Sequence, residues 1–246
     1  NASAQDIQTS GTISIVDTDF HDTLTATQGT PSIVWSAGTV PAQYDLSALT
    51  AAGILQLGSA VSSNGGTVTI AWTYDPAALS LDFLREGETL TITYPITVTD
   101  SRGATDVENL VIVITGTNET PVITGGGDTA SLVETDSTLT ASGSMNVSDV
   151  DYNDTVTISV ASVALSGSFS SSGSTIPTAL SASSYQALKD MMAFSPNSGS
   201  GLAAQPVLGS DFNWTFTSGS SGNSAFDFLR EGESLTLTYT IQATDN

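Results

Sequence analysis

Apolar and polar residues alternate along two long segments of this chain. In residues 90–98 and again in residues 235–243, every second residue is apolar and most of the residues between them are Thr. A period of two predicts an antiparallel strand with one buried face. The two segments are also copies of each other, because LDFLREGETLTITYPITVTD at residues 81–100 returns as FDFLREGESLTLTYTIQATD at residues 226–245. The pattern therefore predicts a tandem repeat of one β-rich unit.

The rest of the chain consists of short apolar segments separated by Gly, Asn and Asp turns. Such spacing, with almost no helical periodicity, predicts an all-β protein made of two β-sandwiches in series. One short helix is expected at residues 185–192, within an insertion of the second copy, and its counterpart in the first copy is residues 46–55. The counterpart of residues 105–115 would follow Asn246, so we expect the last strand of the second domain to be absent from this sequence.

The boundary between the two copies falls in the segment TGTNETP at residues 115–121. Pro121 cannot donate to a strand ladder, and we expect Gly116 to loosen the backbone ahead of it. We therefore predict a first domain at residues 1–116, a linker at residues 117–121 and a second domain at residues 122–246.

Acidic residues recur at matching strand ends in the two copies. The motif D-x-D-x-x-D occurs as DTDFHD at residues 17–22 and as DVDYND at residues 149–154. A Glu-Gly-Glu turn precedes each long strand, and Asp100 or Asp245 follows it. Asp and Glu favour turns in any protein, so one such motif alone would mean little. Recurrence in register instead favours a duplicated cation site.

Calcium is the cation that this pattern favours. It takes six to eight oxygen ligands from carboxylates and carbonyls on flexible loops. Two carboxylates about 4 Å apart repel by about 4 kcal/mol at an effective dielectric constant of about 20, so clustering several of them makes sense if a cation neutralises them. Zinc or copper is disfavoured, because the chain has one His and no Cys.

The stretches FLREGE, TLTITYPITVTDSRGATD and ITGTNETP resemble the VCBS-type, cadherin-like repeat of large bacterial RTX-type surface adhesins. The resemblance covers both copies nearly end to end. It implies two Ig/cadherin-like Greek-key β-sandwiches with calcium bound between successive domains. It also implies ligands from the acidic turn, the linker, the D-x-D motif, a late aspartate and a first-strand glutamate, which is Glu134 here.

Taken together, the motifs and the resemblance predict oxygen ligands for Ca²⁺ in both domains and in the linker. The candidate ligands are Asp17, Asp19, Glu86, Glu88, Asp100, Asn118, Glu119, Glu134, Asp149, Asp151 and Asp245.

Composition excludes several other functions. The chain has 25 acidic and 4 basic residues and a net charge of −21, which disfavours binding to nucleic acid or to anionic lipid. It has no stretch of about 18 apolar residues, so we expect no insertion into a membrane. His21 is its only histidine, which leaves little basis for acid–base or nucleophilic catalysis, and we expect the chain not to be an enzyme.

The sequence thus predicts calcium-stiffened spacer repeats of an adhesin that is secreted to the bacterial cell surface and acts in adhesion or biofilm formation. The partners of each repeat would be neighbouring repeats of the same polypeptide. Two alternatives stay open: a self-assembling surface filament or S-layer subunit whose copies pair through edge strands, and a module that binds a carbohydrate or a protein.

Overall fold

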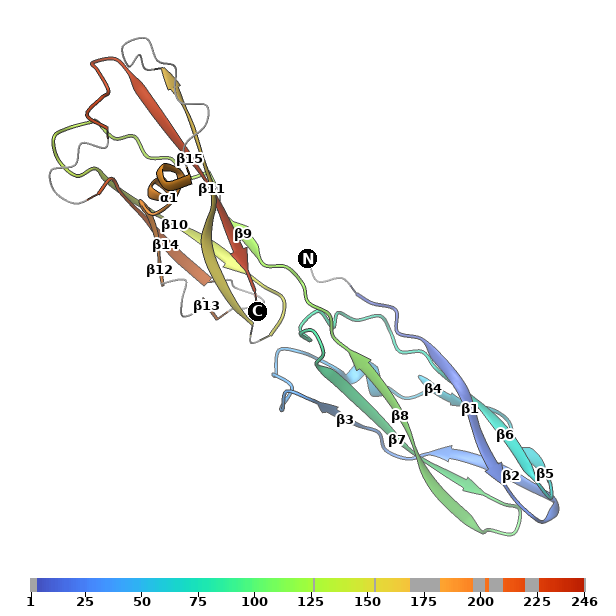
Figure 1. Ribbon diagram of the computed structural model, residues 1–246. Coiled ribbons are helices and arrows are strands. Elements are labelled where there is room, and N and C mark those ends of the chain that lie inside the picture. The colour runs from blue at the N-terminus through green and yellow to red at the C-terminus, as the bar shows by residue number, and fades with distance from the viewer. Residues whose placement is uncertain are drawn as a thin grey trace. The chain divides into compact units, whose positions relative to one another are not determined.

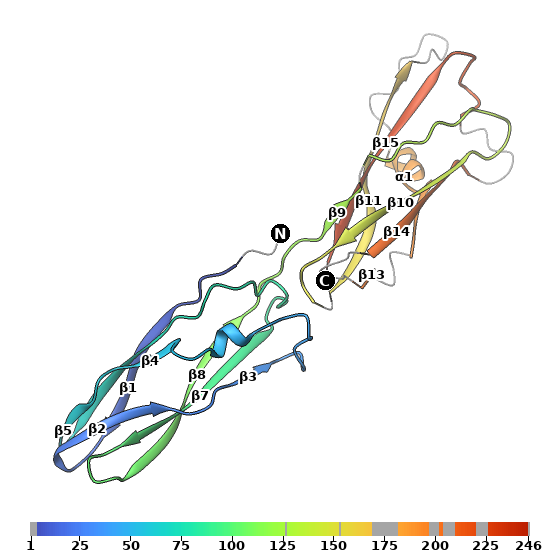
Figure 2. The ribbon, with the colours of Figure 1, turned by 180° about the vertical axis from the view of Figure 1, so that it is seen from behind.

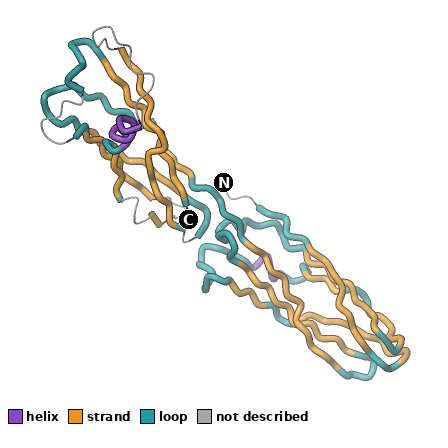
Figure 3. The backbone as a smooth tube through the Cα atoms, viewed as in Figure 1, coloured by secondary structure: helices purple, strands orange, loops and turns teal. Residues whose placement is uncertain are grey.

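The computed structural model describes residues 4–125, 127–152, 154–168, 182–196, 202–203, 210–219 and 226–245. Most of these residues lie in antiparallel strands, so the predicted all-β class is confirmed (Figures 1 and 3). The chain divides into two compact units, Asn1–Asn118 and Glu119–Asn246, and the division falls inside the predicted linker.

The first unit contains eight strands and one 3-10 helix among its described residues. They are β1 (Thr9–Val16), β2 (Phe20–Gln28), β3 (Ser32–Trp35), η1 (Ser47–Thr50), β4 (Leu55–Leu57), β5 (Val61–Asn64), β6 (Thr67–Tyr74), β7 (Thr89–Thr99) and β8 (Thr105–Thr115). One sheet has the order β1-β6-β4, and the other has the order β3-β7-β2-β5 with β8 paired to β7.

β7 is the centre of the larger sheet in the first unit. β8 runs along one edge of it in continuous antiparallel register, while β2 and β3 follow one another along its other edge. The inward side chains of β7 that alternate in the sequence, from Leu90 to Ile96, are all at most 3 % exposed. Tyr94 of β7 meets Tyr74 of β6 edge to face, with ring centroids 6.2 Å apart, so the core lies between the two sheets.

The second unit also consists of two sheets, with seven strands and one α-helix among its described residues. Its described elements are β9 (Val122–Thr124), β10 (Thr140–Ser148), β11 (Thr155–Ser168), α1 (Ala182–Lys189), β12 (Met192–Ser195), β13 (Leu202–Ala203), β14 (Ser210–Thr217) and β15 (Ser234–Thr244). The sheets have the orders β12-β14-β10-β9 and β13-β11-β15. Phe216 of β14 packs against Tyr239 of β15, which places the core between these sheets as well.

In each unit, a tyrosine of the long strand donates a hydrogen bond to a backbone carbonyl of the short helix. Tyr94 and Tyr74 both donate hydrogen bonds to the carbonyl of Leu49 in η1, and Tyr239 donates to the carbonyl of Leu188 in α1. The two helices are therefore counterparts, as the sequence predicts. α1 lies beside β11 (Figures 1 and 2) and begins at Ala182 rather than at Tyr185. It ends at Lys189, because the chain enters β12 at Met192.

From the sequence we expect Gly116, at the end of the first unit, to loosen the linker. The structure shows a different reason for a glycine at this position. A Cβ atom at this position would collide with the backbone carbonyls of Leu84 and Arg85. The amide of Gly116 also donates to the carbonyl of Glu88 at 2.8 Å. Glycine here allows a close approach of two backbones, so it anchors the segment to the unit instead of loosening it.

Candidate metal centre

The D-x-D-x-x-D motif occupies the same place in both units. It fills the turn between β1 and β2 in the first unit and the turn between β10 and β11 in the second. The pairing of Thr25 with Thr99 brings the end of β7, and so Asp100, to the same end of the unit as the first motif. The pairing of Thr157 with Thr244 does the same for Asp245 and the second motif. The predicted association of a motif with a late aspartate is thus present within each unit.

The first motif gathers three carboxylates, and we call Asp17, Asp19 and Asp22 the first triad. One oxygen from each of these residues lies within 4.8 Å of the others. The amide of Asp19 donates to Asp17 Oδ1 at 2.9 Å, which holds these two residues together. His21 has a φ of 69°, a left-handed conformation that bends the chain between Asp19 and Asp22. Their spacing is within the range that one cation can bridge.

One basic side chain and one hydroxyl group contact the first triad, and the basic side chain offsets part of its negative charge. Asp22 is only 4 % exposed, and its Oδ1 accepts from Ser101 Oγ at 2.9 Å and from Arg102 Nε at 3.3 Å. The buried Oδ2 atoms of Asp17 and Asp22 have no hydrogen-bond partner in the part of the chain that the structure describes. The first triad therefore holds one carboxylate next to a protein cation and two oxygens that can still take a ligand.

Asp100 closes the turn that follows β7. Its Oδ1 accepts from the amides of Arg102 at 2.8 Å and Ala104 at 2.9 Å. These backbone hydrogen bonds, the one from Ala104 first, lower the pKa of Asp100. Asp100 thus shapes the β7–β8 turn that carries Arg102 to the first triad.

The second motif is buried more deeply. Asp149, Asp151 and Asp154 are 2 %, 0 % and 1 % exposed, respectively. The amide of Asp151 donates to Asp149 Oδ1 at 3.0 Å, and the amide of Glu119 donates to Asp151 Oδ2 at 2.9 Å. The last contact joins the predicted linker to the motif, across 32 residues of sequence, within the second unit.

The second motif lies among further acidic residues, whose charges raise the pKa values of Asp149 and Asp151. The pKa of Asp151 is raised to about 7, first by burial and then by the neighbouring charges of Glu119, Asp149 and Asp154, against the opposing hydrogen bond from the Glu119 amide. Burial also raises the pKa of Asp149, with contributions from Asp245 and Asp154. We call these five residues, Glu119, Asp149, Asp151, Asp154 and Asp245, the second-unit cluster.

Three oxygens of the second-unit cluster are suited to an external ligand. Asp149 Oδ2, Asp151 Oδ1 and Asp245 Oδ2 are buried and accept no hydrogen bond from any described group. A buried acceptor without a donor costs free energy, and a charged one costs more. Carboxylate oxygens are hard ligands of the kind that Ca²⁺ takes. Among the described residues, however, the first triad is the group whose ligand oxygens all lie within 4.8 Å of one another.

Glu86 and Glu88 lie at the other end of the first unit from the first triad. β7 separates Glu88 from Asp100 by 11 residues, which is roughly 35 Å at about 3.3 Å per residue. Glu86 is exposed. Glu88 is 9 % exposed, and its carboxylate accepts from Trp35 Nε1 at 3.1 Å and from Arg85 Nε at 3.0 Å. The structure therefore gives Glu88 a role in holding its own turn.

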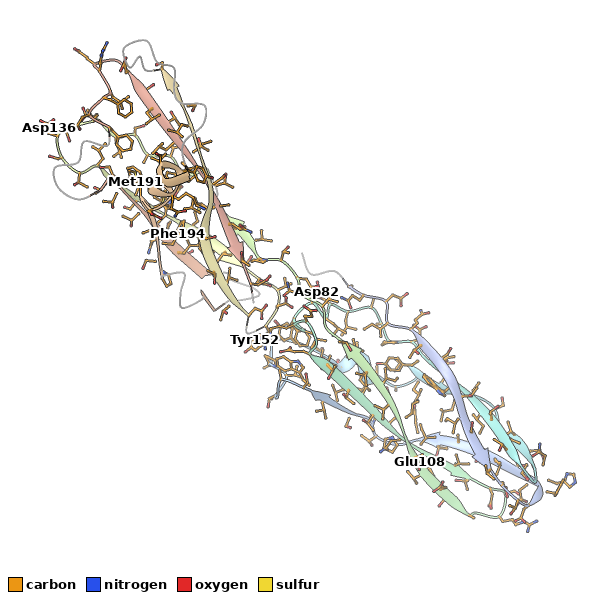
Figure 4. The ribbon with its side chains drawn as sticks, viewed as in Figure 1. Asp82, Glu108, Asp136, Tyr152, Met191 and Phe194 are labelled. Atoms are coloured by element: carbon orange, nitrogen blue, oxygen red, sulfur yellow. The ribbon has the colours of Figure 1, made fainter. Side chains whose placement is uncertain are left out.

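The two remaining candidates lie outside both groups of carboxylates. Asn118 is exposed and is the last residue of the first unit. Glu134 lines a shallow hollow with Ser218 and Phe226. Figure 4 shows Asp136, two positions further along the chain, at the opposite end of the second unit from Tyr152, which neighbours Asp151. Glu134 is consequently separate from the second-unit cluster.

Sequence reasoning left out Asp22, Asp154 and Arg102. The third aspartate of each motif recurs in register, and that recurrence is the signal that would have added Asp22 and Asp154 to the candidate ligands. Nothing local marks Arg102, because it reaches Asp22 through the pairing of β2 with β7.

No protein-family model matches this chain, and no curated protein sequence matches it. Within the described ranges, none of the helices has the length and apolar character needed to cross a lipid bilayer. Functional conclusions therefore rest on the two groups of carboxylates and on the fold that positions them.

Proposed function

We propose that this chain consists of calcium-binding spacer repeats of an adhesin that is secreted to the bacterial cell surface. In this proposal each unit is an Ig/cadherin-like Greek-key sandwich similar to the VCBS-type repeat, and its partners are the neighbouring repeats of the same polypeptide. The duplicated unit and the duplicated acidic motif support the proposal, because a spacer needs a repeating module with the same ligands in each copy.

The second-unit cluster is the observation that carries the proposal. Like charges buried close together repel strongly, and the neighbouring acidic groups raise the pKa values of Asp149 and Asp151. The chain has 4 basic residues against 25 acidic ones, so it has few cations of its own with which to offset this repulsion. A divalent cation reverses the sign of the interaction. The residues that would hold it are Glu119, Asp149, Asp151, Asp154 and Asp245.

The position of Glu119 gives the cation a mechanical role. Glu119 belongs to the linker, and its amide already contacts Asp151. A cation held by both residues would fasten the linker to the second unit and remove conformations that the short linker otherwise samples. The linker would then become stiffer when calcium is bound, which suits a module that holds an adhesive domain away from a cell.

Scattering and calorimetry together test this proposal. Calcium should narrow the distribution of maximum dimensions in small-angle scattering and should raise the melting temperature, while chelator should reverse both effects. Asp151→Asn should remove most of both responses. Asp136→Asn is the matched control, because Asp136 is exposed and lies at the far end of the same unit (Figure 4). Identical scattering with calcium and with chelator would remove the spacer mechanism.

We also propose that the chain is not an enzyme. His21, its single histidine, is exposed at the start of β2, and its ring is tilted against that of Phe20, with ring centroids 6.0 Å apart. The buried aspartates of the second motif lie beside other acidic groups, an arrangement that favours cation binding over proton transfer.

A further inference from the structure

The turn between β5 and β6 contains an Asn-Gly sequence, which occurs once in this chain. Asn64 is the last residue of β5, and Gly65 and Gly66 follow it. Asn64 is exposed, so solvent reaches its side-chain amide. Its Oδ1 accepts a hydrogen bond from the Gly66 amide at 3.0 Å, which folds the side chain back over the turn. The ring that this hydrogen bond closes contains both Cγ of Asn64 and the backbone nitrogen of Gly65.

The fold itself requires the glycine at position 65. Gly65 has a φ of 77°, a left-handed conformation that other residues rarely adopt. A Cβ atom at this position would also collide with the ring of Phe20. The residue that follows Asn64 is therefore one without a side chain, and no Cβ shields its backbone nitrogen.

Two hydrogen-bonding features make this turn chemically reactive. The amide of Gly65 donates to no group among the described residues, so a base from the solvent can reach its proton. The amide of Gly66 already donates to Asn64 Oδ1, and it would stabilise negative charge that develops on this oxygen. Both features favour attack of the Gly65 nitrogen on Cγ of Asn64.

The turn lies against the segment that carries the first triad. Phe20 of β2 pairs with Asn64 of β5. Ser63, the residue before Asn64, donates a hydrogen bond from its hydroxyl to the backbone carbonyl of Asp19. A charge created at position 64 would therefore arise beside the turn that holds Asp19.

We propose that Asn64 is a site of spontaneous deamidation, which adds a carboxylate beside the first triad. A solvent base takes the proton of the Gly65 amide, and the nitrogen forms a bond to Cγ of Asn64. The bond between Cγ and Nδ2 then breaks, and the side-chain nitrogen takes a proton from water and leaves as ammonia. The resulting succinimide ring is opened by a water molecule, which leaves aspartate or isoaspartate at position 64. Either product carries a negative charge where the asparagine was neutral.

The new charge would change cation binding in a defined direction. A further carboxylate near the first triad increases its attraction for a divalent cation, so its calcium affinity should rise a few-fold. This consequence rests on the calcium binding proposed above, whereas the deamidation itself does not. The first triad would then bind calcium more tightly as the molecule ages.

Peptide mapping by mass spectrometry tests the deamidation on the native full chain, incubated at mildly alkaline pH. Asn64 should be converted at least about tenfold faster than Asn109, an exposed asparagine of β8 that precedes Leu110. Asn64→Gln is the matched variant, because its longer side chain would have to close a larger ring, and position 64 should then keep its amide. Conversion of Asn109 as fast as Asn64, or no conversion at Asn64, would overturn the proposal.

Isothermal titration with calcium tests the consequence, using variants in the Asp151→Asn background. Asn64→Asp should bind calcium at the first triad a few-fold more tightly than the Asn64 parent, and Asn64→Gln should match the parent. Equal or weaker binding by Asn64→Asp would overturn the effect on the first triad. Loss of calcium binding in all three chains would overturn the calcium site of the first triad as well, while the mass measurement would still decide the deamidation.

Discussion

The two D-x-D-x-x-D motifs have the same spacing but different surroundings. In the first triad Asp19 is exposed, and Asp22 contacts Arg102, so a cation of the protein takes up part of the negative charge. In the second-unit cluster the three aspartates of the motif are buried, and their charged neighbours include Glu119 and Asp245. The same motif thus supplies the same carboxylates in both units, whereas the segments around it decide how deeply they are buried and which charges lie beside them.

The largest expected effect is the loss of calcium stabilisation when the second-unit cluster is disabled. Calcium at about 100 times Kd stabilises a single site by about 2.7 kcal/mol, which corresponds to a rise of roughly 5–15 °C in melting temperature for a unit of this size. Asp151→Asn should remove most of this rise, whereas Asp19→Asn should remove little of it. Differential scanning calorimetry with calcium and with chelator measures both. Equal losses would mean that the two motifs are equivalent, and the comparison would fail.

The next effect is a pH dependence of stability in chelator. The folded-state pKa of Asp151 is raised to about 7, above the value of about 3.9 in an unfolded chain. Between these pH values the folded state binds more protons than the unfolded state, so stability is highest near pH 4 and falls as the pH rises towards 7. Asp151→Asn should flatten this fall and Asp136→Asn should not. Urea unfolding at a series of pH values is the measurement, and a fall of equal size in both variants would contradict the assignment to Asp151.

A smaller effect on stability is expected at Glu88 in the first unit, and the exposed Glu86 is the residue to compare with it. Glu88→Ala leaves the buried Trp35 Nε1 without its acceptor and should cost about 1–3 kcal/mol. Glu86→Ala changes an exposed side chain and should be within about 0.5 kcal/mol of the parent chain. Neither variant should alter the calcium response of the second-unit cluster. Chemical denaturation with and without calcium is the measurement. If either residue is a calcium ligand, its variant should gain less stability from calcium than the parent chain does.

The smallest effect concerns Arg102. Its side chain is 69 % exposed, so the ion pair with Asp22 contributes at most about 1 kcal/mol to stability. Arg102→Gln should therefore cost little stability, while it should raise the calcium affinity of the first triad a few-fold by removing a competing positive charge. Isothermal titration in the Asp151→Asn background isolates this site. A decrease in affinity would mean that Arg102 organises the first triad instead of competing with a cation.

The sequence alone determined the repeat, the long strands, the short helix in the insertion and the place of the linker. These features depend on local periodicity and on turn residues, which act over a few positions of the chain. The recurrence of Asp149 and Asp151 in register with Asp17 and Asp19 also marked a group of candidate ligands in each unit.

Only the tertiary structure decided which acids belong together and what each one contacts. Glu88 accepts a hydrogen bond from Trp35, 53 residues away, and Arg102 reaches Asp22 across paired strands. Burial of Asp151 to 0 % exposure and the half-burial of Tyr239 likewise follow from the segments packed around them. Such contacts depend on strand pairing between distant residues, and no local pattern in the sequence encodes the resulting burial, which controls the repulsion among the carboxylates.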